Sequence, residues 1–530
     1  MGATIDRSNE ERVRYEVGAD LRVSNLSSFY ARSSARLRES YGAIPGVGSV
    51  SVALRGRGSV GAGDGGEGFT YMGIESDTFD SWFRDDFSDK TLSELMAALR
   101  PVGPVEPLTI PDGATEIRLW VNPGKYFPLV FVWIVLQDST GSTRTVTLER
   151  LGFPGWHMLS AELPDDLQPP LRVVSIQLNE PGYGAVGTVG HAVFDDLHVV
   201  IGATGEEVLL EGFEDDLAWT ALPTSVIDSD ELSLSSERVH SGDQAAVFDF
   251  GKETNRGVRG FYRASGGGGL PVIASSSFAD SVGASGGSSL IVSLPGGLVP
   301  VEIIELVDYF PTVDPAGGGF LLFDLDTLVS YVDALNPLAS TRVNELFLST
   351  TDGNDEAVLS DVSGLLRNQG RVNGARAQLE SLRTDPLVSA GWRAMVPGAL
   401  GVILFTAGLG YVVYLWAIAD HGAGEIGLLR SLGLSRLQVV GLVGLEHLLV
   451  AMIGLSVGAW AGFQMSRLTV SSVAVADGGG RVLPPFILTT EWSIMGPLYG
   501  ALVAMFLVSL LTLGRHMLRV DLRRLSRMEG

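Results

Sequence analysis

The feature that most limits the fold of this chain is a set of three long apolar stretches near its C-terminus. Pro397–Ile418 runs for 22 residues without a charge. As a helix it would rise about 33 Å at ~1.5 Å per residue, which is enough to cross a bilayer. Gln438–Phe463 is interrupted only by Glu446 and His447, and Ile494–Gly514 is uncharged throughout. A buried core helix explains one such stretch, but three in succession predict transmembrane helices at about 397–418, 438–463 and 494–514.

Charge is divided unevenly between this end and the rest of the chain. From Arg393 onward there are ten Arg and seven Asp or Glu residues, a net charge of +3. The first 392 residues carry 27 basic and 54 acidic side chains, a net charge of −27. An acidic region joined to an apolar, weakly basic end excludes a nucleic-acid-binding protein, which needs a basic surface. The absence of cysteine excludes a disulfide scaffold, a thiol nucleophile and any Cys-based metal site.

The arginines predict how the chain is oriented in the membrane. Arg430 and Arg436 lie between the first two stretches, and five arginines follow the third. Because positive residues favour the cytoplasmic side, we expect the first loop and the C-terminus to be cytoplasmic and residues 1–392 to lie outside the plasma membrane. Met1–Asn25 lacks the apolar core of an export signal. We therefore expect that Met1 is an internal start with a transmembrane segment upstream, or that the chain is one part of a split protein.

The first loop carries the most specific motif. Residues 421–437 read HGAGEIGLLRSLGLSRL, a pattern that predicts a short amphipathic helix along the inner membrane face. Within it, EIGLLRSLGLS at Glu425–Ser435 resembles the E-I-G-x-L-R-A-L-G signature of FtsX-like permeases, the membrane subunits of MacB, lipoprotein-release and related ABC systems. The resemblance covers Trp392–Gly530 and implies a separate cytoplasmic ABC ATPase that docks on this loop. The implied coupling residues are Glu425, Ile426, Gly427, Leu429, Arg430, Leu432 and Gly433.

The second apolar stretch contains two further features. Gly454, Gly458 and Gly462 recur at four-residue spacing and form one smooth stripe, which favours close approach of another helix, from another permease half or a second copy. A lipid-facing helix that tolerates glycine is the alternative. Glu446 is ionisable near mid-depth, which makes it a functional candidate, although a helix–helix hydrogen bond is the simpler interpretation, with His447 reaching toward the interface.

The region before the membrane part contains strand–helix–strand patterns split by a long gap. Gly18–Ala53 predicts a strand, a helix from about Ser28 to Tyr41 and a second strand. Leu270–Phe310 predicts short strands, and Phe320–Leu335 and Ala357–Asn368 predict helices. These pieces resemble the periplasmic core domain of MacB-type permeases.

The gap predicts an antiparallel sandwich, because β-type runs recur in it at roughly ten-residue spacing. The runs are Glu116–Val121, Leu129–Gln137, Thr143–Leu151, Trp156–Leu163 and Arg172–Leu178. Asp138–Pro164 and His191–Val200 resemble later strands of a galactose-binding-type jelly roll, whereas Glu211–Thr220 and Val239–Phe250 resemble its opening strands. We therefore expect one permuted jelly roll rather than two incomplete sandwiches with open edges, and a gene-level rearrangement is the remaining alternative.

The predicted fold class is a multidomain membrane protein. An α+β extracytoplasmic core domain carries an inserted all-β jelly roll and is followed by three transmembrane helices. The expected domains are the first part of the core at 1–103, the jelly roll at 104–262, the second part of the core at 263–390 and the FtsX-like permease domain at 391–530.

Two kinds of ligand site are conceivable in the jelly roll. Trp120, Trp133, Trp156 and Trp219 offer aromatic platforms for a sugar, although a core tryptophan is the commoner outcome. Four carboxylates would supply the oxygen ligands of a Ca²⁺ ion if the strand ends bring them together, and a solvated acidic loop explains them equally well. These carboxylates are Asp195, Asp196, Glu211 and Glu214.

No motif in this sequence indicates a catalytic function. There is no G-x-x-x-x-G-K-[ST] motif, so we expect no ATP hydrolysis by this chain and, calcium apart, no cofactor in it. The favoured function is a permease subunit of an ABC exporter or mechanotransmission complex. Its expected partners are the ATPase, the lipid bilayer, and a carbohydrate or lipoprotein. The alternative is a membrane-anchored surface protein that binds carbohydrate or cell wall through its jelly roll.

Overall fold

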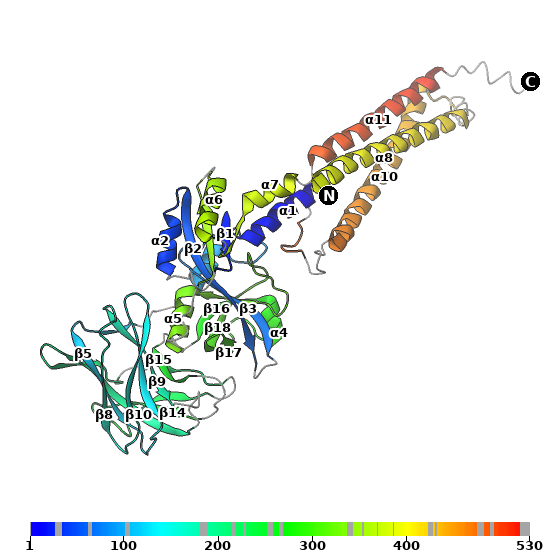
Figure 1. The fold of residues 1–530 in the computed structure, drawn as a ribbon. Coiled ribbons are helices and arrows are strands. Elements are labelled where there is room, and N and C mark those ends of the chain that lie inside the picture. The colour runs from blue at the N-terminus through cyan, green and yellow to red at the C-terminus, as the bar shows by residue number, and fades with distance from the viewer. Residues whose placement is uncertain are drawn as a thin grey trace, which may run out of the picture. The chain divides into compact units, whose positions relative to one another are not determined.

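The chain forms two compact units, which are described separately (Figure 1). One is Arg14–Arg376, and the other combines Met1–Val13 with Ala377–Gly530. The computed structural model describes residues 2–26, 34–61, 66–100, 106–180, 188–214, 218–225, 229–251, 258–263, 269–335, 343–351, 354–367, 369–384, 386–421, 428–429, 432–473, 482–487 and 492–519.

A nine-stranded mixed sheet forms the first part of the larger unit, in the order β17-β18-β16-β19-β3-β2-β20-β1-β21. Its strands come from both sides of the sandwich segment in the sequence. The early strands are β1 (Leu21–Ser24), β2 (Val47–Val60) and β3 (Glu67–Ile74). The later strands are β16 (Leu270–Ser275), β17 (Ser289–Leu294), β18 (Gly297–Val307), β19 (Phe320–Asp324), β20 (Glu345–Thr350) and β21 (Arg371–Gly374).

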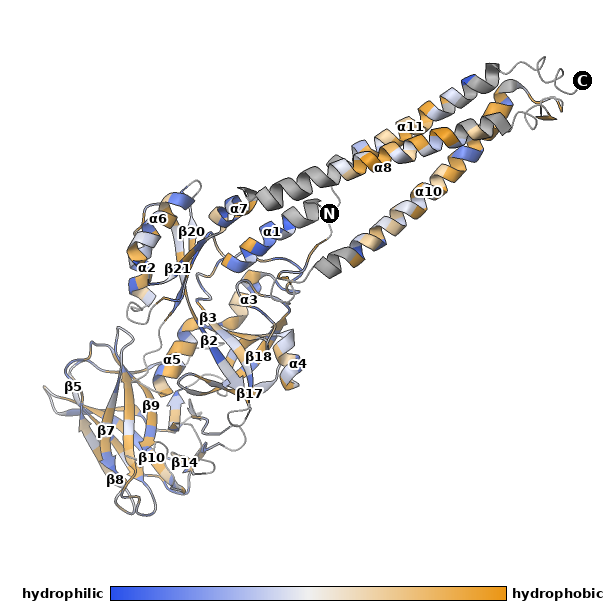
Figure 2. Ribbon diagram, turned by 45° about the vertical axis from the view of Figure 1, so that its right-hand side comes forward, coloured by the Kyte–Doolittle hydropathy of each residue, from blue (hydrophilic) through white to orange (hydrophobic). Residues whose placement is uncertain are grey.

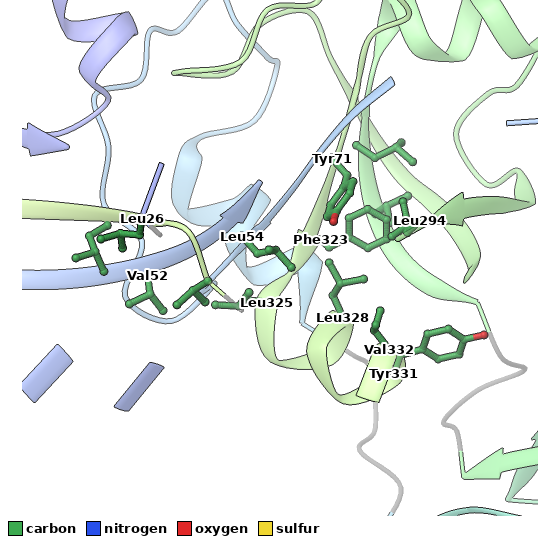
Figure 3. Close-up of a cluster of buried hydrophobic side chains, with 14 of the residues drawn as sticks. Leu26, Val52, Leu54, Tyr71, Leu294, Phe323, Leu325, Leu328, Tyr331 and Val332 are labelled. Atoms are coloured by element: carbon green, nitrogen blue, oxygen red, sulfur yellow. The ribbon is translucent and has the colours of Figure 1, made fainter. Parts of the chain in front are cut away.

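Helices cover both faces of this sheet. The α3 helix (Leu92–Leu99) packs on one face, where Leu95 and Leu99 are fully buried. The other face is covered by α2 (Ser34–Gly42), α4 (Ser276–Val282), α5 (Leu325–Leu335) and α6 (Asp355–Leu366). Figure 3 shows α5 side chains, including Leu325 and Leu328, in the apolar cluster on this second face of the sheet. Two apolar layers therefore enclose the sheet.

The prediction of a helix over the whole of Phe320–Leu335 is wrong for its first five residues. Phe320–Asp324 is the strand β19, which pairs with β3 in parallel and with β16 antiparallel. Phe320 and Leu322 face one apolar layer, and Leu321 and Phe323 face the other. A strand buried on both faces has a continuous apolar sequence, which periodicity cannot distinguish from a buried helix.

Strands β4 to β15 form a sandwich of two six-stranded antiparallel sheets. The first contains β5 (Ala114–Asn122), β8 (His157–Glu162), β10 (Gly190–Ile201), β11 (Glu206–Glu211), β13 (Glu231–Ser235) and β14 (Ala245–Phe250). The second contains β4 (Leu108–Ile110), β6 (Phe131–Gln137), β7 (Thr143–Arg150), β9 (Leu171–Asn179), β12 (Trp219–Ala221) and β15 (Arg259–Arg263). One apolar cluster joins the inner faces of both sheets.

The five sandwich strands expected before residue 180 are present as β5 to β9. The two later runs differ from expectation. Glu211–Thr220 contains only the end of β11 and the start of β12, and Val239–Phe250 is a strand only from Ala245. His240 and Ser241 instead donate backbone hydrogen bonds to Asp195, which holds this segment against β10 as a loop. The limits of the sandwich domain at 104 and 262 stay a prediction.

The sandwich contacts helix α5 through polar side chains of β9. Gln177 Nε2 and Ser175 Oγ donate hydrogen bonds to the carbonyl of Ala334, at 2.6 and 3.2 Å. Tyr262 packs edge-on against Tyr331 with ring centroids 4.9 Å apart. These contacts satisfy a carbonyl in the last turn of α5, which has no partner within the helix itself.

A buried ion network joins three strands of the nine-stranded sheet. Glu345 on β20 accepts hydrogen bonds from Arg22 on β1 at 2.8 Å and from Arg55 on β2 at 2.7 and 3.1 Å. Arg55 also donates to the carbonyl and hydroxyl oxygens of Thr312. Burial alone would raise the pKa of Glu345, but Arg55 and Arg22 outweigh that effect and hold the pKa below its ordinary value.

The smaller unit contains long apolar helices. These are α8 (Pro386–His421), α10 (Arg436–Val473) and α11 (Trp492–Arg519), and Figure 2 marks many of their residues as hydrophobic. Each of the three expected spans lies within one of them. Among the described residues, Leu437–Leu468 is long and apolar enough to cross a membrane, and Gly398–Tyr414 and Met495–Ser509 are shorter apolar segments. In sequence, the boundaries between the two units fall within α1 (Gly2–Val17) and α7 (Ala375–Thr384).

Candidate functional site

Between α8 and α10, the described residues Leu428, Leu429 and Leu432–Ser435 include a turn that ends at Gly433. The N–H of Leu432 donates to the carbonyl of Leu428 at 3.1 Å, and that of Leu434 donates to Leu429 at 3.4 Å. Gly433 has φ +96°, a left-handed conformation that glycine adopts without a steric penalty. This is the arrangement of a helix stopped by a C-terminal glycine. The glycine of the L-G-L-S motif therefore has a backbone role.

A capping box starts α10 two residues later. Ser435 Oγ accepts a hydrogen bond from the N–H of Gln438 at 3.3 Å, and Gln438 Oε1 accepts one from the N–H of Ser435 at 2.9 Å. The two side chains satisfy donors that a helix start leaves without partners. A helix stop and a helix start thus stand two residues apart, which fixes a sharp turn before α10.

The leucines of this turn differ in exposure. Leu428 is 66% and Leu432 is 73% exposed, and Leu437 at the start of α10 is 78% exposed, whereas Leu429 is partly buried. Exposed large apolar side chains next to each other are typical of a contact surface for lipid or protein. Of the other predicted coupling residues, Glu425, Ile426, Gly427 and Arg430 lie outside the described residues.

The glycine stripe of α10 faces no other helix among the residues that the structure describes. A Cβ atom added at Gly454, Gly458 or Gly462 would meet no atom within 4 Å. The close approach within this unit occurs elsewhere, because a Cβ at Gly408 of α8 would collide with the sulfur of Met505 on α11. The stripe stays available for lipid or a further helix, and its role in packing stays a prediction.

Glu446 and His447 occupy different environments. Glu446 is exposed on α10, and His447 is only 5% exposed. The His447 ring lies edge-on to two tyrosines of α8, with centroids 6.5 Å from Tyr411 and 6.1 Å from Tyr414. The structure thus places His447 in a helix contact, rather than extended toward the membrane surface as the sequence suggested.

The four carboxylates proposed for calcium hold separate partners. Asp195 and Asp196 bind the loop around His240. Glu211 accepts hydrogen bonds from Trp219 and Arg263, and Glu214 accepts them from the backbone of Asp243 and Gln244. Over the described part of the chain, no group of three or more His, Asp or Glu side chains could hold a metal ion. The calcium site therefore has no support from the described geometry.

Asp195 and Asp196 instead organise one loop on the sandwich. Asp195 is fully buried and its Oδ2 accepts hydrogen bonds from the N–H groups of His240 and Ser241, at 2.8 and 3.3 Å. Burial raises the pKa of Asp195, and the negative charge of Asp196 adds to this, although the backbone donors partly offset both. Asp196 sits at a β-bulge with φ +44°, which turns its carboxylate toward the same loop.

The four tryptophans proposed as platforms lie in different environments. Trp219 is 2% exposed and belongs to the sandwich core. Trp133 is half-buried on β6, whose alternate residues Val132 and Ile134 face the core. Trp120 and Trp156 lie together against His240. Sequence reasoning missed His240, because its position depends on contacts with strands more than 40 residues away.

The C-terminal region has apolar helices of the kind found in membrane domains, and among the described residues Leu437–Leu468 is long enough to cross a bilayer. Residues 398–517 match the model of the FtsX-like permease C-terminal family. The matched segment includes most of α8 and all of α10, as well as α11 up to residue 517. No curated protein matches the chain.

Proposed function

We propose that this chain is the permease subunit of an ABC exporter or mechanotransmission complex. A separate cytoplasmic ATPase binds the loop between α8 and α10 and transmits its closure through the helices to residues 1–392. The chain itself hydrolyses no ATP. The observation that carries this proposal is the match of residues 398–517 to the FtsX-like permease C-terminal domain.

The geometry of the loop supports a mechanical role. Among the described residues, the turn at Gly433 leads directly into the capped start of α10, so a movement imposed on this turn passes to the helix. Exposed Leu428 and Leu432 lie on the turn and can insert into an apolar groove of the ATPase. The residues proposed to contact the ATPase are those of the loop motif, Glu425 to Gly433.

The two parts of the larger unit have separate proposed identities. The nine-stranded sheet with its helices corresponds to a MacB-like extracytoplasmic core domain, and strands β4 to β15 correspond to an inserted jelly roll of the galactose-binding type. The sheet order supports an insertion, because β3, which precedes the sandwich in sequence, pairs with β19, which follows it.

The proposed topology has three transmembrane helices, with the first loop and the C-terminus in the cytoplasm. Reporters inserted between Asp420 and Gly424 and fused after Gly530 test it. Both should give a cytoplasmic signal, and an extracytoplasmic signal from either would contradict the orientation derived from the arginines. Co-purification of the full chain with an ABC ATPase from the same cells tests the function itself.

A membrane-anchored surface protein is the second candidate. The observation that favours it is the cluster of aromatic rings on the outer face of the sandwich. The two candidates differ in one measurable property, because a surface anchor needs no ATPase on the loop between α8 and α10. Stable association of an ABC ATPase with that loop therefore decides for the permease.

A further inference from the structure

We propose that the sandwich is docked on helix α5 as a fixed part of the larger unit, so that it moves together with the nine-stranded sheet. The docking surface is the outer face of β6, β9 and β15, and its partner is the C-terminal end of α5. The docked state rests on contacts within the larger unit alone. Its mechanical consequence, that a movement of the nine-stranded sheet carries the sandwich along, rests on the proposed permease function.

The outer face of this sheet is buried, although it points away from the sandwich core. Ile134 of β6 and Ile176 of β9 belong to that core. Strand alternation turns their neighbours Val135 and Ser175 to the opposite face, where both are nonetheless fully buried. Ser175 pairs with Val135 on one side and with Tyr262 of β15 on the other, so the three form one row across the sheet. Such a row needs another element to cover it.

The last turn of α5 covers this row. Gln177 Nε2 and Ser175 Oγ both donate hydrogen bonds to the carbonyl of Ala334, at 2.6 and 3.2 Å. Tyr331 of α5 packs edge-on against Tyr262, with ring centroids 4.9 Å apart. Both tyrosines are buried, and both belong to the apolar cluster that α5 shares with the nine-stranded sheet. The core of the nine-stranded sheet therefore continues onto the outside of the sandwich.

The apolar and polar contacts oppose different movements. Separation of the sandwich from α5 would expose Tyr262 and Tyr331 to water, which the hydrophobic effect disfavours. Sliding of the sandwich along α5 would leave the buried amide of Gln177 and the carbonyl of Ala334 without their hydrogen bond. A buried polar group that loses its partner is strongly destabilising. The contact therefore resists both separation and sliding, unlike the polar contact of a loosely tethered domain.

The other sheet of the sandwich has an open outer face. Ile117 and Leu119 of β5 belong to the sandwich core, and the alternate residues Glu116, Arg118 and Trp120 are partly exposed. A sandwich fixed through one face presents the other in a constant direction relative to the nine-stranded sheet. Any partner of this open face would then be moved with the sheet.

Distance measurement by double electron–electron resonance on the full-length protein in detergent micelles tests the docking. The chain has no cysteine, so spin labels attach only where cysteines are introduced. Thr147→Cys on β7 and Asp361→Cys on α6 both replace exposed residues, one on the sandwich and one beside the nine-stranded sheet. A docked sandwich should give one narrow peak in the distance distribution between the two labels. Tyr262→Ala combined with Gln177→Ala removes an apolar and a polar contact with α5, and this narrow peak should be lost.

Tyr126→Ala is the matched control. Tyr126 is 64% exposed on the same sandwich, so its loss should leave the narrow peak unchanged. A broad or divided distribution in the protein with intact docking residues overturns the proposal, and this measurement decides even if the double variant does not fold. A narrow peak that persists in a folded double variant also overturns it, because α5 would then not hold the sandwich. The experiment contains no ATPase, so failure here is distinguishable from failure of the permease function.

Discussion

Glu345→Ala should destabilise the larger unit more than any surface charge substitution, because it removes the anion of the buried network on β1, β2 and β20. The Glu345 side chain is 4% exposed, and its partners Arg22 and Arg55 are 13% and 20% exposed. Removing one partner of a buried ion pair costs about 3–5 kcal/mol, since the remaining charge stays buried without compensation. Because both arginines keep some contact with water, we expect the lower end, about 3 kcal/mol.

Thermal unfolding of the purified full-length protein, followed by tryptophan fluorescence, measures this effect. For a unit of this size the transition should fall by roughly 5 °C. Glu305→Ala is the matched control. Glu305 on β18 of the same sheet pairs with Lys90, which precedes α3, but the two side chains are 25% and 46% exposed. Such surface pairs contribute about 0–1 kcal/mol. Equal shifts in the two variants would refute the assignment of the network as a stabilising element.

Three further predictions concern the pH dependence of Glu345, the contact between α8 and α11, and the sandwich domain. The pKa of Glu345 is lower in the folded state than in the unfolded chain, so its ionisation stabilises the folded state above the ordinary glutamate pKa of about 4.3. This stabilisation should disappear as the pH falls from about 5 toward about 3. Urea unfolding at each pH measures the free energy of unfolding, which should decline less steeply with falling pH in Glu345→Gln. Gly408→Leu should separate α8 from α11 and lower the melting temperature in detergent, whereas Gly454→Leu should not, because only the first glycine faces another helix. A protein of residues 104–262 should fold alone, with cooperative melting and negligible helix by circular dichroism, and an unfolded product would contradict the inserted-domain proposal.

The C-terminal helices were predictable because their signal is local. A run of uncharged residues long enough to cross a bilayer needs no knowledge of its neighbours, and each expected span falls within one helix. The turn at Gly433–Ser435 was accessible for the same reason, since a glycine stop and a Ser-x-x-Gln cap are short sequence patterns.

The sequence was less informative where long-range pairing decides the structure. Phe320–Asp324 is apolar at every position except the last, and only its pairing with β3 and β16 makes it a strand. Glu345 meets Arg22 across 323 residues of chain. His240 reaches Asp195 across 45 residues, which converted an expected strand into a loop. None of these contacts leaves a periodic pattern, so a single sequence does not reveal them.

The most direct test of the proposed function is co-purification of the ATPase with a Leu432→Asp variant. Leu432 is 73% exposed, so a charge there should not disturb folding. Leu429 is partly buried, so Leu429→Asp would change the stability of the protein as well as the binding of the ATPase. Leu365→Asp is the control, because Leu365 is 55% exposed on α6, outside the loop.

We predict that Leu432→Asp inserts normally in the membrane and loses the ATPase, while Leu365→Asp retains it. A buried apolar anchor carries more of an interface's affinity than a charge at its rim, so Glu425→Ala should weaken the association less. Normal ATPase binding and normal stimulated hydrolysis in the Leu432→Asp protein would contradict the assignment of this loop as the coupling element.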